Sequence, residues 1–197
     1  MKQHIEIALP IIDEDELNLV ELPHISMNAM NQWYSKIGMV ANELDLYRNN
    51  VSLAILAGKQ LGDEFIPVVS VTCKIPNYLG ANIPTQLDNW VQVSMVTVDK
   101  QRALEGYTKA TYEAITKHFD LVSDRKQYWA AKKLWQSLAR NSAAHIFVFD
   151  GTTQDYVRDA DGKPHKYDGK NIPENTIWGK SIPHAKRLLV ATRKNLV

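Results

Sequence analysis

Residues 90–106 read WVQVSMVTVDKQRALEG, and this stretch organises the prediction of the fold. Its first part, residues 91–98, contains four valines and one methionine, a composition that favours a buried strand. The polar pair Asp99 and Lys100 follows as a turn. Over residues 104–118 the apolar side chains then recur three and four positions apart, which is the spacing of a helix with one buried face. The sequence therefore predicts a long strand that passes through a tight turn into a helix.

The segments after this helix repeat the alternation of strand and helix. Residues 119–122 and 145–150 are short apolar runs typical of buried strands, and residues 124–141 between them have helical spacing. Because the chain returns through a helix from strand 90–98 to strand 119–122, these two strands are expected to be parallel, with a right-handed crossover.

The C-terminal part is expected to hold one long loop and a final strand. Residues 151–179 are rich in turn-forming dipeptides and have few apolar anchors, so they predict a loop, and a loop of this length is usually functional. Residues 187–192 form an apolar run that predicts the last strand.

The N-terminal part predicts a strand, a helix and a hairpin. Residues 5–9 alternate apolar and polar side chains, as a half-buried strand does. Apolar residues from Met30 to Leu44 lie three and four apart, which predicts an amphipathic helix of about four turns. The apolar runs 51–57 and 65–74 flank a polar segment and predict a hairpin with a loop over residues 58–64.

These segments together predict a mixed α/β (α+β) fold. We expect a single domain over residues 1–197, with a mixed sheet of about six or seven strands and helices on both faces.

Composition indicates the cellular compartment in which the protein is expected. The net charge is +1, and no apolar run approaches the length of a membrane-spanning helix. The first residues lack the layout of a signal peptide. The single cysteine, Cys73, excludes an internal disulfide and is typical of a reducing compartment. We therefore expect a cytoplasmic protein that does not contact a membrane.

The order of elements and two short segments resemble the GNAT superfamily of acyl-CoA-dependent N-acyltransferases. That family has a central strand followed by a turn of the pattern [Gln/Arg]-x-x-Gly-x-[Gly/Ala], which opens a helix. Gln101 and Gly106 match the first and last positions, and Leu104 stands at the internal glycine. Residues 126–140 are similar to the late helix of the family, with Trp135 at the place of its tyrosine. The altered motif also resembles that of GNAT-like proteins encoded by bacteriophages.

The resemblance implies an acyl-CoA cofactor such as acetyl-CoA, and a small amine or a protein amine as acceptor. Backbone N–H groups at the turn and the dipole of the helix would hold the CoA pyrophosphate. The strand backbone near residues 96–98 would meet the thioester oxyanion. The implied cofactor-binding residues are Val96, Val98, Gln101, Arg102, Ala103, Leu104, Glu105 and Gly106. The candidates for the catalytic acid or base are Asp99, His145, Tyr128 and Tyr156.

Two other functions stay open from the sequence. The first is a GNAT-shaped protein that has lost catalysis and acts by binding a host or partner protein. The second is a nucleic-acid-binding or -modifying protein that uses a basic C-terminal segment, because basic residues among aromatic ones suit phosphates and unstacked bases. The residues of that segment are Lys163, Lys166, Tyr167, Lys170, Trp178, Lys180, Lys186, Arg187, Arg193 and Lys194. The histidines show no metal-ligand spacing, and we expect no metal site.

Overall fold

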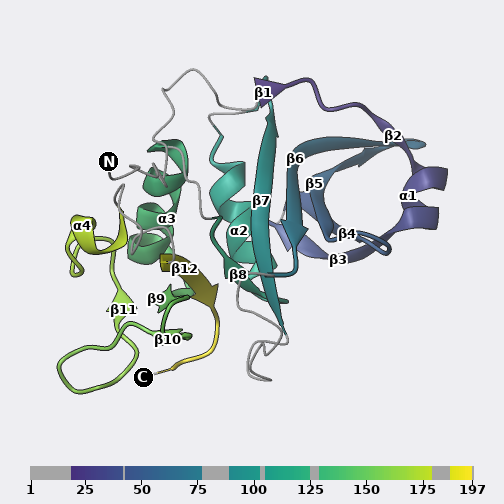
Figure 1. The fold of residues 1–197 in the computed structure, drawn as a ribbon. Helices are drawn as coiled ribbons and strands as arrows, with labels where there is room; N and C mark the ends of the chain where they lie inside the picture. Colours follow the sequence, from purple (N-terminus) through teal and green to yellow (C-terminus); the bar gives the residue numbers. More distant parts are fainter. Residues whose placement is uncertain are drawn as a thin grey trace, which may run out of the picture.

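The central strand of the sheet is β7 (Trp90–Asp99), as residues 90–98 predicted, and the rest of the fold is arranged on either side of it (Figure 1). The structure is a computed structural model and describes residues 19–41, 43–76, 89–102, 105–124, 129–178 and 187–196. The strand predicted at residues 5–9 lies outside these ranges.

The described residues form four helices and one mostly antiparallel sheet. The helices are α1 (Met27–Trp33), α2 (Tyr107–Ile115), α3 (Trp129–Asn141) and α4 (Glu174–Ile177). The longer strands are β3 (Tyr34–Val40), β4 (Leu44–Asn49), β5 (Ala54–Leu61), β6 (Glu64–Lys74), β7, β8 (Asp120–Val122), β9 (His145–Asp150) and β12 (Arg187–Thr192). The two-residue strands are β1 (Leu19–Val20), β2 (Ile25–Ser26), β10 (Asp155–Tyr156) and β11 (Lys166–Tyr167).

The sheet is larger than predicted. Nine strands follow the order β10-β9-β12-β8-β7-β6-β5-β4-β3, and β1, β2 and β11 pair at its sides. The prediction of about six or seven strands was wrong, because β3 and β4 lie in the segment predicted as a helix and strands of two residues are too short to give a periodic signal. The mixed character of the sheet was predicted correctly: β8 pairs with β7 in parallel through the helix α2, while most other pairs are antiparallel.

The long helix predicted from Met30 to Leu44 is wrong. Only α1 is helical, and the chain then forms β3 and β4, which pair with each other from Tyr34↔Asn49 to Val40↔Leu44. Apolar residues three and four apart do not by themselves distinguish a helix from two short strands. Pairing of β4 with β5 on its other side brings these residues into the sheet and overrides the helical spacing.

The hairpin predicted from residues 51–74 is present, but with a shorter connection. β5 and β6 pair as far as Leu61↔Glu64, so the turn is the two residues Gly62 and Asp63. Most of the expected loop, including Gly58, belongs to β5. The Gly58 position needs a glycine, because a Cβ there would lie 2.2 Å from the backbone oxygen of Ile66.

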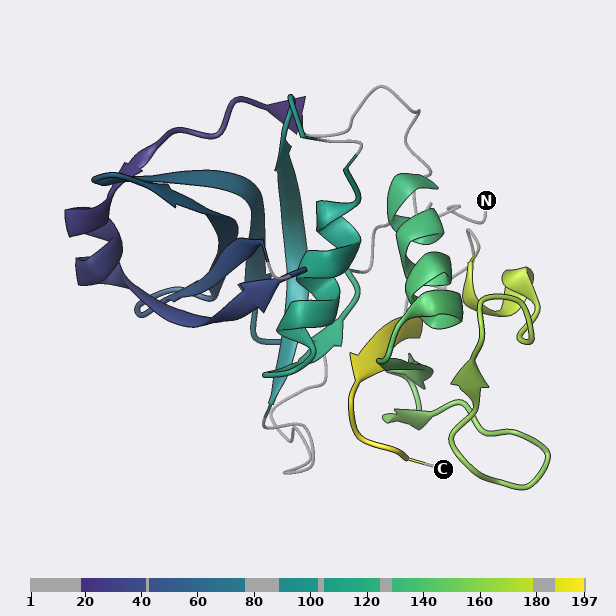
Figure 2. The ribbon, with the colours of Figure 1, turned by 180° about the vertical axis from the view of Figure 1, so that it is seen from behind.

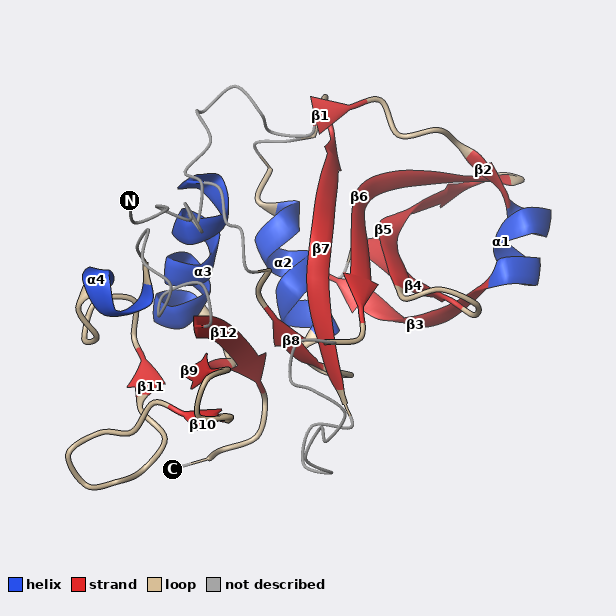
Figure 3. Cartoon of the chain, in the orientation of Figure 1, coloured by secondary structure: helices blue, strands red, loops and turns tan. Residues whose placement is uncertain are grey.

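The helices cover both faces of the sheet. α2 and α3 lie side by side (Figures 2 and 3), and Tyr112 of α2 packs edge-on against Trp135 of α3 with ring centroids 5.8 Å apart. Both rings belong to the main core, together with Ile55 and Val69 from the sheet. On the other face α1 contributes Met30 to a separate core. Its other buried members are Tyr47, Leu56 and Phe65.

The segment predicted as a long loop after residue 150 is attached to the edge of the sheet. In its described part, β10 and β11 both pair with β9, and α4 follows. Tyr167 and Ile177 are buried in the main core. The prediction of a loop without secondary structure was therefore wrong, because a few buried side chains are enough to hold the segment against β9.

Candidate functional site

The turn after β7 is closed by hydrogen bonds within itself. Asp99 Oδ1 accepts a hydrogen bond from the backbone N–H of Gln101 at 3.0 Å. The backbone N–H of Arg102 donates to the Asp99 carbonyl at 2.9 Å, and that of Glu105 donates to the Arg102 carbonyl at 3.2 Å. Asp99 thus fixes the turn with one carboxylate oxygen. The amides of Gln101, Arg102 and Glu105, which were predicted to bind a cofactor, already donate to protein acceptors.

The start of α2 lies directly after this turn. Gly106 precedes the helix with φ of 75°, a left-handed conformation that favours glycine. The first N–H groups of a helix have no acceptor within the helix and carry its positive dipole end. Tyr107 Oη donates to Glu43 Oε2 at 2.7 Å and ties the helix start to the chain between β3 and β4. The sequence therefore positions an electropositive helix end beside the end of β7.

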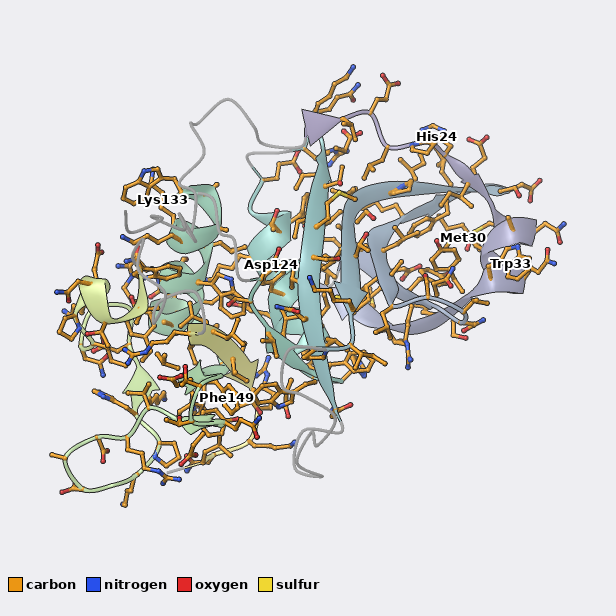
Figure 4. The ribbon with its side chains drawn as sticks, viewed as in Figure 1. His24, Met30, Trp33, Asp124, Lys133 and Phe149 are labelled. Atoms are coloured by element: carbon orange, nitrogen blue, oxygen red, sulfur yellow. The ribbon has the colours of Figure 1, made fainter. Side chains whose placement is uncertain are left out.

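The segment before β2 crosses the same region. β1 pairs in parallel with the last two residues of β7, and the backbone N–H of Lys100 donates to the Val20 carbonyl at 3.1 Å. The Lys100 ammonium also contacts Glu21 at 3.1 Å. The chain then continues through His24, labelled in Figure 4, into β2.

A cavity of about 290 Å³ lies beside the turn. It occupies a break in the pairing along β6: Val69 of β6 pairs with Val98 of β7, whereas Phe65 pairs with Ile25 of β2. Ile66, Pro67 and Val68 lie between these two pairings and have no partner strand on that side among the described residues. The cavity is lined by Glu21, Leu22, His24, Leu44, Lys59, Ile66, Pro67, Val68, Asp99, Gln101 and Arg102.

The cavity has an apolar side and a charged rim. The apolar side comes from β4, from β6 and from Leu22. The charged groups come from the turn, from β5 and from the segment between β1 and β2. Arg102 pairs with Glu105 at 3.1 Å, and His24 with Glu64 at 3.1 Å. Lys59 has no ion pair or hydrogen bond to any described side chain. A ligand with an apolar group and charged substituents fits this combination.

A second feature of β7 is the fork where β8 leaves it. β8 pairs with β7 only from Trp90↔Asp120 to Gln92↔Val122. Just beyond, Ser94 is an extra residue in the pairing with β6, because Cys73 faces Val93 and Thr72 faces Met95. Within the described chain, the edge of β7 at residues 93–97 therefore has no strand partner on the side of β8. An unpaired strand edge offers N–H and C=O groups to an extended ligand.

The fork carries polar groups in a buried setting. Gln92 is 0% exposed and its Nε2 donates to the Ser123 carbonyl at 3.1 Å, while its Oε1 has no hydrogen-bond partner among described groups. Asp124 (labelled in Figure 4) lies next to Ser123 and contacts the Lys74 ammonium at 3.6 Å. Burial raises the pKa of the nearby Cys73 thiol to about 12, which makes Cys73 a poor nucleophile at neutral pH.

Two predicted catalytic residues lie elsewhere. His145 begins β9 and pairs with Thr192 at the end of the sheet where β7 begins. At about 3.3 Å per residue along β7, His145 is roughly 30 Å from Asp99. Tyr156 packs its ring against Phe147, Phe149 and Trp90 at centroid distances of 5.7, 5.5 and 6.3 Å. The separation of Tyr156 from Asp99 can be followed in Figure 4 through two labelled residues. Phe149, which contacts the Tyr156 ring, and His24, which lines the same cavity as Asp99, lie on opposite sides of β7.

The ionisation of these two residues follows from their surroundings. Burial lowers the pKa of His145, and the nearby Lys166 and Arg193 lower it further. Burial raises the pKa of Tyr156 well above its usual value, and Asp120 adds to this shift. Neither side chain reaches the turn, so the structure does not bring them together with Asp99.

Of the remaining residues predicted to bind the cofactor or to act in catalysis, only some lie in the described part of the chain. Val96 and Val98 are half-buried in β7 and pack against the main core. Tyr128, Ala103 and Leu104 lie outside the described residues.

Sequence reasoning missed Lys59, Glu21 and Gln92. No local pattern marks them, because strand pairing and chain crossing bring them to the site.

The two aromatic residues of the basic C-terminal segment differ in burial. Tyr167 is 0% exposed, and the Trp178 ring lies against the ammonium of Lys132 with 5.7 Å to its centroid. Arg187 contacts Asp150 at 3.5 Å, and Lys194 contacts Asp120 at 2.8 Å. Tyr167 is therefore not accessible for base stacking in this conformation, whereas Trp178 is half-buried.

Two further properties concern the described residues as a whole. No helix among them is both long and apolar enough to cross a membrane. In the same ranges, no three side chains of the His, Cys, Asp and Glu types come together as they would around a metal ion.

No protein-family model matches the sequence, and neither a curated protein nor a solved structure matches the chain.

Proposed function

We propose that this chain is a GNAT-like N-acyltransferase that transfers an acyl group from acyl-CoA, such as acetyl-CoA, to an amine. The observation that carries the proposal is the position of the turn after β7. Asp99, Gln101 and Arg102 line a cavity beside the turn that leads into α2, and β8 then returns parallel to β7. Ligands of α/β proteins commonly bind at the carboxyl ends of such strands, next to helix N-termini.

The proposed cofactor position follows β7. The pantetheine chain carries amide groups and pairs with the free strand edge at residues 93–97, as a peptide strand would. The thioester lies at the end of this chain that is remote from the pyrophosphate, where a free backbone N–H of β7 stabilises the oxyanion. Because the amides of Gln101, Arg102 and Glu105 are engaged within the turn, the pyrophosphate contacts come from the Arg102 side chain and the first amides of α2.

The proposed reaction needs one general base. The amine nitrogen attacks the thioester carbon, a C–N bond forms, and the C–S bond breaks to release the CoA thiolate. Asp99 uses Oδ1 to hold the turn, which leaves Oδ2 to accept the proton of the attacking amine, directly or through water. The proton released by the amine balances the charge of the thiolate after exchange with solvent.

Calorimetric titration with acetyl-CoA and with CoA tests the cofactor. We expect both to bind, and we expect Arg102→Ala to weaken binding about tenfold, the loss of one charge-assisted contact of about 1.4 kcal/mol. Lys133→Ala on the exposed face of α3 is the matched control and should bind as the unmodified chain does. Absence of heat and of any thermal shift at millimolar acetyl-CoA would reject the proposal.

A further inference from the structure

We infer that the cavity beside Asp99 binds a zwitterionic α-amino acid with an apolar side chain, which is the acyl acceptor. The class of ligand is inferred from the cavity alone, whereas the role of the ligand as acyl acceptor rests on the proposed function. Three chemical features of such an amino acid, its carboxylate, its ammonium group and its side chain, each meet a different part of the lining.

The apolar part of the lining suits the side chain. Leu44, Pro67 and Val68 are buried, so the accessible apolar surface comes from the half-buried Leu22 and from Ile66, which lies between the pairings with β7 and β2. Pro67 has no N–H, so this break in the sheet leaves one donor fewer to satisfy. An aliphatic or aromatic group covering these residues is removed from water, at about 25 cal/mol for each Å² of apolar surface.

The cationic part of the lining suits a carboxylate. Lys59 extends from β5 and has no partner among the described residues. Arg102 also lines the cavity, but it pairs with Glu105 at 3.1 Å and its other N–H groups are assigned to the pyrophosphate, so Lys59 is the cation left for a carboxylate. These two side chains reach the cavity from different elements, one from the sheet and one from the turn. A carboxylate beside Lys59 gains a charge-assisted contact.

The anionic part suits an ammonium group. Asp99 keeps one carboxylate oxygen free of the turn, and Glu21 lines the same cavity while it contacts Lys100 at its outer side. The presence of both charge signs argues against a simple anion, which the two carboxylates would repel. It also places the ammonium group of the ligand at the residue proposed as general base. This group releases one proton to solvent before the neutral amine attacks, and Asp99 accepts the second proton during the attack.

The size of the cavity agrees with this ligand. A volume of about 290 Å³ is close to the ~300 Å³ at the lower end of the range for small-molecule sites. A free amino acid with a medium-sized apolar side chain has this size, whereas a peptide segment would extend far beyond the cavity.

Binding of three probes by the full chain, in the absence of CoA, tests the inference. The probes are leucine, leucinamide (no carboxylate) and 4-methylpentanoate (no amine), each followed by calorimetry and by chemical shifts. We expect leucine to bind at least tenfold more tightly than either analogue. Lys59→Gln should remove the preference for leucine over leucinamide, and the control Lys133→Gln should retain it.

The results separate this inference from the proposed function. No binding of leucine at concentrations up to 50 times the protein's, or equal binding of all three probes, overturns the inference even when acetyl-CoA binds. Preferential binding of leucine that depends on Lys59 supports the amino-acid site even when acetyl-CoA does not bind, and it is then the acyltransferase that fails. Unchanged preference in Lys59→Gln also overturns the inference, provided that the variant unfolds at the same urea concentration as the unmodified chain.

Discussion

Gln92 of β7 donates from Nε2 to the backbone carbonyl of Ser123 over 3.1 Å, and so joins β7 to the residue that follows β8. Both residues are 0% exposed. Ser123 Oγ in turn accepts a hydrogen bond from the backbone N–H of Leu189 in β12 at 3.0 Å. This chain of contacts links three strands at the fork, where the parallel pairing of β7 and β8 ends.

Replacing Gln92 by glutamate should make the fold sensitive to pH. Burial raises the pKa of the introduced carboxyl above its unfolded value of about 4.3, so its protonated form donates to Ser123 as the amide does. Stability is then retained below pH 4 and lost as the pH rises through the folded pKa. At pH 7 we expect a loss on the order of 3 kcal/mol. Urea unfolding at pH 4 and 7 measures it, and the neutral control Gln92→Met should lose about 1 kcal/mol at both pH values.

Gly58→Ala should destabilise the protein because the hairpin has no room for a methyl group. The added Cβ would lie 2.2 Å from the Ile66 oxygen and 2.7 Å from the Phe65 ring. Overpacking of this kind costs about 1–3 kcal/mol. The adjacent Lys59→Gln, with an exposed side chain, should stay within about 0.5 kcal/mol of the unmodified chain. Equal urea midpoints for the two variants would contradict the observed contact.

Lys132 joins α3 to α4, and its partners predict an order of variant stabilities. Its ammonium lies 2.6 Å from Glu174 Oε2 and 4.7 Å from the Trp129 ring centroid, and its side chain is only 9% exposed. Glu174→Ala leaves this cation without its carboxylate, whereas Lys132→Met keeps the packing and removes the charge. We therefore expect Glu174→Ala to lower the free energy of unfolding by about 1–2 kcal/mol and Lys132→Met by less. The reverse order in thermal unfolding would show that the ion pair does not matter.

His145 should make the protein less stable in mild acid. Burial, with Lys166 and Arg193 nearby, lowers its pKa in the folded chain below the ordinary value of 6.5. The unfolded chain therefore takes up a proton first, and stability falls as the pH drops below 6.5 towards the folded pKa. His145→Gln should remove this part of the pH dependence. Parallel stability curves for both chains between pH 7.5 and 5, measured by urea unfolding, would exclude the effect.

The strands and helices around β7 were predictable because their signals are local. β12 (Arg187–Thr192) and β9 (His145–Asp150) have the predicted bounds, and β7 differs by one residue. Each is a run of apolar residues between polar ones, so its composition alone predicts that it is a buried strand. The parallel pairing of β7 with β8 also followed, since a strand that returns through a helix has few other arrangements.

The candidate site was predictable only in part. Gln101 and Arg102 were proposed from a motif and Asp99 from its place at the end of the strand, and all three line the cavity. His145 and Tyr156 were proposed by residue type, and the sheet places them at its other end. The type of a side chain says what chemistry it can do, but not which strand order will carry it towards or away from another residue.

The sequence by itself determined where β7 begins, that it turns at Asp99 and that a helix follows, because strand propensity, turn residues and helical spacing act over a few neighbouring residues. Only the tertiary structure decided that residues 34–49 form two strands instead of one helix, since hydrogen bonding with β5 outweighs their spacing. It also decided that Lys59, Glu21 and Arg102 share one cavity. These three residues are far apart along the chain, and the break between β7 and β2 along β6 is what brings them together.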